Sequence, residues 1–379
     1  MATLATTSAF AQFSIDGVVD AGFQSINYKG NKVTGFAGNG SSTSQLNFRG
    51  KENLGGGLMI DFRVETDWNM ASNAGNTGTP SGINVSSGDK SINSSGGTFG
   101  NGELRLGLTG SLGRVDFGAV NYTTLDATLA GQPFGTAIGS GFRTIYVNDA
   151  QANSSVRADN SFKYTSPNIS GLTFTVYKVM KQTKATVVAT PSAATGLAGQ
   201  PNAFGPLGAY DYFGVQEVGL KYNNGPFNAV FTNLTQDWVG VQATNASNGA
   251  AGTAKFTINT LGMNYMLTND LKLFLLNQGY KGDVGGKNNR TTTVSASYYV
   301  GASTWSLQAG GTRAADGTRS SFTGVGVDYA LSKTTALYAR SESVNDAAKT
   351  VQPAVGSGAQ ISGPDTKFGR TAFGLRMAY

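Results

Sequence analysis

The sequence predicts an all-β fold, a sixteen-stranded antiparallel β-barrel that crosses a membrane. Three observations lead to this prediction. Segments of about ten residues alternate apolar and polar side chains, as strands do when they face lipid on one side and water on the other. The connections between these segments are alternately short and long, and arginines fall on the polar face of the segments.

The composition of the 379 residues disfavours most enzymes. With no Cys there can be no disulfide, thiol nucleophile or Cys-based zinc site, and with no His there can be no Ser-His-Asp triad or His acid–base relay. Asp, Glu, Lys and Tyr remain as possible catalysts. We expect no enzyme, and neither a cofactor nor a metal ion.

The charge and polarity balance favours strands joined by polar loops. Charged residues make up 13% of the chain, against about 25% in a typical soluble domain, and hydrophobic residues only 39%. There are 53 glycines, about twice the usual share. The net charge of +6 is spread along the chain without a block of like charges, so no nucleic-acid partner is expected.

The N-terminus reads as the end of a secretory signal. The tripeptide Ala9-Phe10-Ala11 fits the A-x-A pattern of signal-peptidase cleavage, although the basic region that usually precedes such a site is missing. We therefore assign residues 1–11 to a residual signal peptide and residues 12–379 to a single barrel domain. No run of 18 or more apolar residues is present, so no transmembrane helix is predicted.

The strands follow one another from Phe13 to the C-terminus. In the first, Phe13, Ile15 and Phe23 fall on one face, whereas Asp16 and Asp20 fall on the other. The same alternation predicts strands at 45–51, 58–65, 103–109, 114–117, 160–166, 172–180, 215–222, 227–234, 255–265, 271–278, 291–300, 304–311, 321–330, 334–342 and 367–379. In the last of them, Phe373, Leu375, Met377 and Tyr379 share a face.

The connections predict which end of the barrel faces outward. Short ones, rich in Gly, Asn and Pro, lie at residues 53–57, 110–113, 223–226 and 331–333. Long ones lie near 26–43, 66–99, 121–159, 181–214, 235–254 and 343–366. Outer-membrane barrels have short periplasmic turns and long extracellular loops, so this order favours such a barrel.

Two soluble alternatives explain less. A β-sandwich also has alternating strands, but it does not predict sixteen of them with strictly short and long connections. A solenoid needs a fixed repeat, which is absent. Lys178 is the one misfit, since it shares the apolar face of residues 172–180, and we expect it at the outer rim.

Several motifs resemble the Gram-negative porins of the β-proteobacterial type. The stretches that carry the resemblance are DGVVDAG at 16–22, FRGKENLGGGL at 48–58, NSFKYTSP at 160–167 and FGLRMAY at 373–379. The resemblance implies a homotrimer of sixteen-stranded barrels in the outer membrane, each with its third loop folded into the lumen. That family often has Arg where this chain has Gln45 and near Gly102, and it usually ends in Phe rather than Tyr379, so a strong anion preference is not expected.

The predicted selectivity site combines the early strands with the third long connection. Selectivity in pores comes from charges at the narrowest point. Two interpretations stay open: a basic wall opposite an acidic loop, which would set up a transverse field, or wall charges paired with Asp61, Glu65, Glu103 and Asp116. The residues that we assign to this site are Arg49, Arg63, Arg105, Arg114 and Asp116 on the strands and Asp126 and Asp149 in the loop of residues 121–159.

Three functions remain at this point. The first is passive diffusion of small hydrophilic solutes and ions through a water-filled channel with mild charge selectivity. The second is a channel specific for a small organic acid or another nutrient, and the third is an outer-membrane adhesin or structural barrel. The expected partners are two further copies of the chain, outer-membrane lipid, lipopolysaccharide, and the transported solutes or ions.

Overall fold

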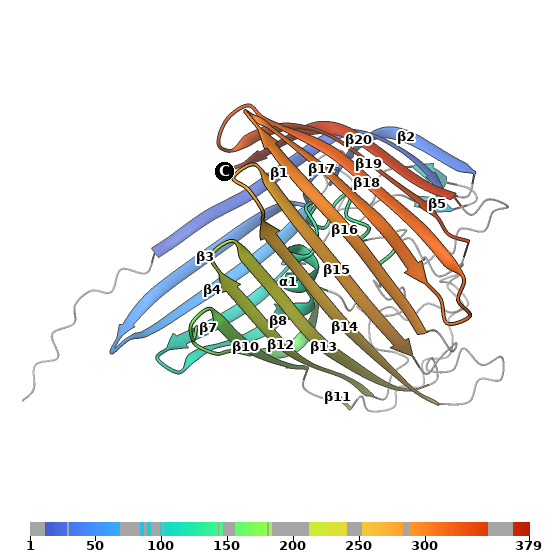
Figure 1. Ribbon diagram of the computed structural model, residues 1–379. Coiled ribbons are helices and arrows are strands. Elements are labelled where there is room, and N and C mark those ends of the chain that lie inside the picture. The colour runs from blue at the N-terminus through green and yellow to red at the C-terminus, as the bar shows by residue number, and fades with distance from the viewer. Residues whose placement is uncertain are drawn as a thin grey trace, which may run out of the picture.

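The computed structural model is an antiparallel β-barrel with one helix inside it (Figure 1). It describes residues 12–28, 30–68, 84–86, 89–91, 99–100, 102–142, 144–146, 156–179, 182–183, 212–240, 252–282, 288–347 and 367–379. The predicted signal segment, residues 1–11, lies outside these ranges and stays a prediction.

The sheet closes on itself through its first and last strands. β1 (Gln12–Tyr28) pairs along one edge with β20 (Lys367–Ala378), and along its other edge with β2 (Asn31–Gly38) and β3 (Ser44–Gly55). From β3 to β20, each barrel strand pairs with the next barrel strand along the chain, which removes free sheet edges as a membrane requires.

The remaining strands run in order around the wall. They are β4 (Leu58–Trp68), β7 (Leu104–Gly110), β8 (Gly113–Asn121), β9 (Arg157–Thr165), β10 (Leu172–Val179), β12 (Tyr212–Asn224), β13 (Phe227–Gly240), β14 (Gly252–Met266), β15 (Leu271–Gly282), β16 (Asn288–Val300), β17 (Ser303–Arg313), β18 (Arg319–Ala330) and β19 (Thr335–Asn345). The short β11 (Gln182–Thr183) continues β10 along β12. With β2 and β3 taken as the two parts of one barrel strand, sixteen strands close the barrel, so the predicted fold is confirmed.

The first predicted long connection, 26–43, is wrong in part. β1 extends to Tyr28 and β2 occupies most of the segment, because the chain turns back at once and pairs with β1. The strand is then interrupted: Ala21 pairs with Gly38 but Val18 pairs with Gln45, so the chain between them bulges away from the sheet.

The buried Asp20 carboxylate fixes this bulge. It accepts hydrogen bonds from the backbone N–H groups of Ser41 and Ser42, both at 2.7 Å, and of Gly40 at 3.3 Å. The Tyr338 hydroxyl donates a further hydrogen bond to it at 2.7 Å. Asp20 therefore replaces the ladder hydrogen bonds that the bulge lacks.

The two faces of the wall differ in polarity as the alternation predicts. Along β16, Thr291, Thr293 and Ser297 are buried on the inside, whereas Val294 and Tyr298 are 58% and 51% exposed on the outside. The same contrast recurs around most of the barrel, with the outward apolar band suited to lipid and the inward face largely polar. The space that a soluble protein fills with an apolar core here contains mainly polar side chains and part of the third long connection. One apolar cluster lies among them, in which Ile145 and Tyr146 of that connection join Leu276, Phe322 and other side chains of the wall.

The connections at the two ends differ in length. At the short end, Gly55, Gly56 and Gly57 all have positive φ, which only glycine adopts without strain, and so the chain reverses within the turn between β3 and β4. Lys178 faces outward one residue before the long-connection end of β10. The second long connection holds a small hairpin, β5 (Asn84–Ser86) with β6 (Asp89–Ser91).

Helical structure is confined to α1 (Thr123–Ala130) within the described residues. No helix in the described ranges is long and apolar enough to cross a membrane.

Candidate functional site

The third long connection folds into the lumen directly after β8. Its helix α1 packs against the inner faces of β12, β13, β14 and β15, which follow β8 around the wall after β9 and β10. Figure 1 shows α1 inside the barrel, enclosed by the wall. The described part of this connection therefore narrows the channel.

The N-terminus of α1 is held by a carboxylate from the wall. Glu217 of β12 accepts the backbone N–H groups of Thr123 at 2.6 Å and Thr124 at 2.7 Å. These amides have no partner within the helix, and the N-terminal end of the helix dipole favours a negative charge. The hydroxyls of the two threonines also hydrogen-bond to Thr175 and Thr232, each at 2.8 Å.

The C-terminal half of α1 lies so close to the wall that only glycine fits opposite it. A Cβ atom on Gly262 of β14 would lie 1.6 Å from the Ala127 carbonyl oxygen. Asn264, two residues further along β14, donates a hydrogen bond of 2.8 Å to the carbonyl of Ala130. Gly262 and Asn264 thus fix the height at which the helix crosses the lumen.

Beyond α1 the connection continues along the wall formed by β16 to β19. Gly139 N–H donates to Glu342 at 2.9 Å, Gln308 donates to the Ser140 carbonyl at 3.2 Å, and Thr291 donates to the Ile145 carbonyl at 3.0 Å. These polar contacts join residues far apart in the chain, and Ile145 also belongs to a buried apolar cluster with wall residues such as Phe322. The connection is therefore held against the wall by both kinds of contact.

Arg340 links the bulge between β2 and β3 to the same connection. Its guanidinium donates to the carbonyls of Ser41 at 3.3 Å and Phe134 at 3.2 Å, and it pairs with Asp328 at 3.0 Å. The interrupted barrel strand and the loop in the lumen are therefore held by one side chain.

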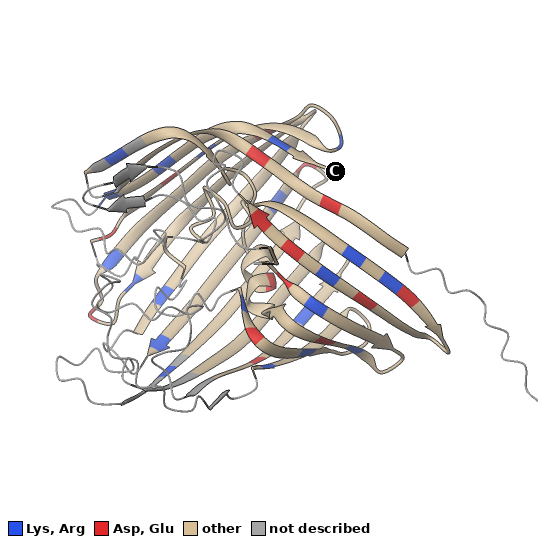
Figure 2. Cartoon of the chain, turned by 180° about the vertical axis from the view of Figure 1, so that it is seen from behind, with Lys and Arg blue, Asp and Glu red and all other residues tan. Residues whose placement is uncertain are grey.

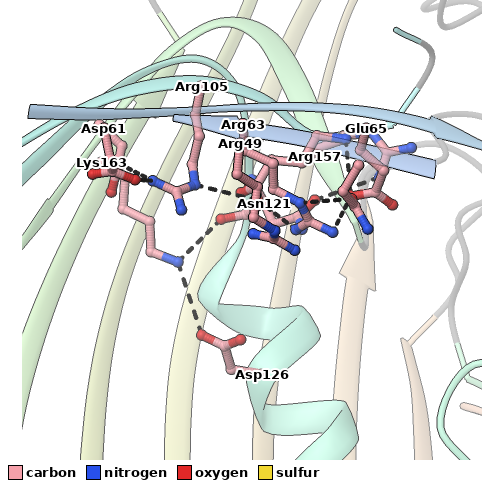
Figure 3. Close-up of polar contacts among 12 residues, drawn as sticks. Arg49, Asp61, Arg63, Glu65, Arg105, Asn121, Asp126, Arg157 and Lys163 are labelled. Carbon is pink, nitrogen blue, oxygen red and sulfur yellow. Dashed lines mark hydrogen bonds and ion pairs between the residues drawn. The ribbon is translucent and has the colours of Figure 1, made fainter. Parts of the chain in front are cut away.

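Four arginines predicted for the site, Arg49, Arg63, Arg105 and Arg114, lie together on the inner wall of β3, β4, β7 and β8, with acids between them. We call this set of side chains the charge ladder. Its ion pairs are Arg49–Asp16 (2.5 Å), Arg63–Glu65 (2.7 Å), Arg63–Glu103 (2.8 Å), Arg105–Asp61 (2.7 Å), Arg105–Glu103 (3.5 Å), Arg105–Asp116 (3.2 Å), Arg114–Asp116 (2.6 Å) and Arg114–Asp61 (2.7 Å). Figure 3 shows Arg49, Arg63 and Arg105.

The pairing within the charge ladder limits the field that it sends into the lumen. Each arginine contacts at least one carboxylate from its own strand or a neighbouring one, and the side chains of Arg63 and Arg105 are only 15% and 19% exposed. Figure 2 shows the same alternation of blue and red on this wall. Opposite charges a few ångströms apart cancel at longer distance, so a passing ion experiences little net charge from the charge ladder.

Asp126 lies apart from the charge ladder, on α1. It pairs with Lys221 of β12 and lies 3.8 Å from Lys163 of β9, as the close-up in Figure 3 shows for Lys163. Lys163 also donates a hydrogen bond of 3.1 Å to the carbonyl of Asn121, where the connection leaves the wall. The only acidic side chain described on the helix is thus neutralised by lysines of the wall.

The structure brings together five of the seven predicted site residues: Arg49, Arg63, Arg105, Arg114 and Asp116. Asp126 occupies a separate cluster, and Asp149 lies outside the described residues. Sequence reasoning missed Glu217, Lys163 and Lys221. Alternation along the strands places these side chains on the inner face, but it does not show which residues of the third connection they contact.

The described ion pairs of the lumen balance in number. They join nine basic side chains, seven Arg and two Lys, to nine acidic ones, and all of these lie on strands or on the lumen loop. Within the described part of the chain, no cluster of three or more acidic residues is arranged to hold a metal ion.

Comparison with known proteins agrees with this architecture. A family model described as Gram-negative porin matches residues 1–347. Outer membrane porin protein 32 of Delftia acidovorans is 33% identical over 171 residues, which is 44% of this chain and 44% of that protein, so the match spans less than half the length of the relative.

Solved structures with the same fold include porins. An anion-selective porin from Comamonas acidovorans superposes with a TM-score of 0.69 at 22% identity, covering 97% of this chain and 100% of that chain. The trimer form of OmpT, an outer-membrane protein of Vibrio cholerae, gives a TM-score of 0.61 at 12% identity, covering 97% and 99%. With a family match over nearly the whole sequence and a closed sixteen-stranded barrel, this chain belongs to the Gram-negative porins.

Proposed function

We propose that the protein forms a water-filled channel in the outer membrane for passive diffusion of small hydrophilic solutes and ions, with weak charge selectivity. The observation that carries the proposal is the polar inner wall with α1 packed across it. A barrel whose inward residues are polar holds water, and a loop fixed by Glu217 and Gly262 limits the size of what passes.

Weak selectivity follows from the balance of lumen charges. The structural neighbour from Comamonas acidovorans is described as anion-selective. In this chain position 45 is an uncharged Gln, and the arginines of the charge ladder are paired with acids. We therefore expect at most a mild preference, set by Arg49, Arg63, Arg105, Arg114, Asp116 and Asp126, together with Asp149.

We also propose that the channel works as a homotrimer and performs no catalysis. A neighbouring fold from Vibrio cholerae is described in its trimer form. Native mass spectrometry of the protein extracted in detergent measures the oligomer directly, and a single-copy mass would contradict the trimer.

Planar-bilayer recording tests the channel itself. The purified protein should produce discrete conductance steps and, in a tenfold salt gradient, a reversal potential close to zero. An absence of steps would refute the channel. A reversal potential near the limit for a single ion would contradict weak selectivity, and current block by one organic acid at low concentration would favour a substrate-specific channel.

A further inference from the structure

Four basic side chains form a row on the outer surface of the barrel, away from the lumen. They are Lys281 of β15, Arg290 of β16, Arg313 of β17 and Arg319 of β18, and all four are exposed. Their neighbours in the chain, such as Tyr280, Thr312 and Ser320, are buried on the inside, so the basic side chains point outward. We call these four residues the outer basic row.

The strand register places like charges directly against one another. Arg290 pairs with Arg313, and Arg313 pairs with Arg319, so three guanidinium groups follow one another across adjacent strands. Lys281 lies on the diagonal, because it pairs with Asn288, two residues before Arg290. Directly opposed residues have Cβ atoms about 4.5–5.5 Å apart, and like charges there are destabilising unless an anion separates them.

No acidic side chain of the described residues pairs with the outer basic row. None of the ion pairs recorded in those ranges includes any of its four members. Asp316, in the turn between Arg313 and Arg319, accepts the backbone N–H of Thr318 at 2.8 Å, which lowers its pKa. Lys255 extends the row on β14, but its register partner is Asp237, and we leave it out.

The height of the outer basic row matches the head groups of the outer leaflet. Trp305 and Arg313 lie near opposite ends of the outward face of β17. At about 3.4 Å per residue they are roughly 27 Å apart along the strand, or about 20 Å along the membrane normal for the usual barrel tilt. The apolar band of such barrels is about 25 Å tall, so the row lies at its long-loop, extracellular edge.

The surface directly below the outer basic row suits acyl chains. Val294, Leu307 and Val325 are 58%, 52% and 43% exposed on the same face of the same strands. Figure 2 shows blue bands near the strand ends on the side where the grey traces emerge. A ligand that fits this surface carries negative charge at one end and hydrocarbon at the other.

We propose that the outer basic row on β15–β18 binds the phosphate groups of a phosphorylated glycolipid of the outer leaflet, whose acyl chains lie along the apolar face below. Arginine forms paired hydrogen bonds with phosphate oxygens, and a phosphate between Arg290 and Arg313 removes their mutual repulsion. This site is separate from the lumen and does not depend on the proposed channel.

Binding of bis-phosphorylated lipid A to the full-length oligomer in nanodiscs tests the proposal. The double variant Arg290→Gln/Arg313→Gln should bind it about thirty-fold more weakly, the effect expected for two basic side chains near an anionic surface. The matched control Lys51→Gln/Lys333→Gln removes the same charge from exposed positions at the short-turn end and should bind like the wild type. Fully dephosphorylated lipid A should bind the wild type and the double variant equally.

Each alternative predicts a different result. Unchanged lipid binding in the double variant, or an equal loss in the control, overturns the proposal. If inorganic phosphate displaces the lipid with equal affinity, the row is a site for free anions, and the proposal is wrong. If the double variant loses its oligomeric state but still binds the lipid, the row is a contact between copies of the chain, and the proposal is again wrong. If the double variant does not fold, as judged by the loss of its β-sheet circular dichroism, Arg313→Gln alone should weaken binding about five-fold.

Discussion

Arg105 is the residue at which the charge ladder is most densely connected. It contacts Asp61 at 2.7 Å, Asp116 at 3.2 Å and Glu103 at 3.5 Å, and its side chain remains 19% exposed to the lumen. These three carboxylates are paired only with Arg63, Arg105 and Arg114 among the described ion pairs, so loss of one arginine leaves net negative charge on the wall. Single substitutions here therefore change selectivity more than they change the width of the channel.

Arg105→Ala should make the channel more cation-selective. A unit charge about 6 Å from an ion in water contributes about 0.7 kcal/mol, so the permeability ratio should change about two- to three-fold. Reversal potentials in a potassium chloride gradient measure it. Glu103→Gln, a neighbour in the same charge ladder, should shift the potential in the opposite direction, and two shifts of the same sign would contradict the assignment.

Gly262 is a second residue whose role is defined by geometry. Since a Cβ atom here would lie 1.6 Å from the Ala127 carbonyl oxygen, Gly262→Ala should force α1 away from β14 and alter the single-channel conductance. Gly279→Ala is the control, because nothing lies within 4 Å of a Cβ atom at that position. Equal conductance in both variants would show that α1 does not limit the current.

At the scale of elements, α1 depends on the wall more than on its own sequence. The helix spans only residues 123–130, and isolated helices of that length are unstable in water. Tyr122, the N-cap residue that precedes the helix, provides no side-chain cap, and Glu217 of β12 supplies the missing acceptors instead. The helix and the wall therefore form one structural unit.

Glu217→Ala should loosen the N-terminus of α1. Hydrogen bonds to a charged acceptor are each worth about 1.5–3 kcal/mol, so amide exchange at Thr123 and Thr124 should accelerate about ten- to hundred-fold. Hydrogen exchange followed by mass spectrometry measures this in the folded oligomer. Gln216→Ala, an exposed outward position on the same strand, should leave exchange unchanged; acceleration in both variants would point to general loss of barrel stability.

At the scale of the whole molecule, the inside and the outside of the barrel carry their charge differently. In the lumen most of the described charged side chains form ion pairs, and the carboxylates of Asp20 and Glu217 accept backbone N–H groups instead, whereas the outer basic row has no described acidic partner. Paired charges give a channel with a weak field, and unpaired charges need a counterion. We therefore expect ion selection in the lumen and lipid binding on the outer surface to respond independently to mutation.

Any selectivity of the channel should fade as salt rises. The screening length falls from about 30 Å at 0.01 M to about 3 Å at 1 M ionic strength, so charges on the wall cease to act on ions along the axis. Reversal potentials measured at a fixed concentration ratio across this range should approach the value set by ion mobility alone. A preference that persists at 1 M would instead indicate a direct binding site.

The sequence alone is sufficient for the number of barrel strands, the face that each residue occupies and the arginines of the charge ladder. Alternation in a strand is a local property with a period of two residues, so Phe23, Val294 and Leu307 can be assigned outward without knowledge of any partner. The same reasoning places Arg105 and Arg114 inward together, because neighbouring strands pair in chain order.

Only the tertiary structure decided how the chain fills the lumen and where it departs from regular pairing. The contacts Glu217–Thr123, Gly262–Ala127 and Glu342–Gly139 join positions between 94 and 203 residues apart, and which strands face each other across the lumen depends on closure of the whole sheet. The bulge at 39–43 is fixed in the same way, since Tyr338 completes the hydrogen bonds of Asp20 only when β19 and β20 close against β1. The alternation of side chains along a strand follows from the local backbone conformation. These contacts instead depend on how the whole sheet curves and closes into a barrel, which no short stretch of sequence encodes.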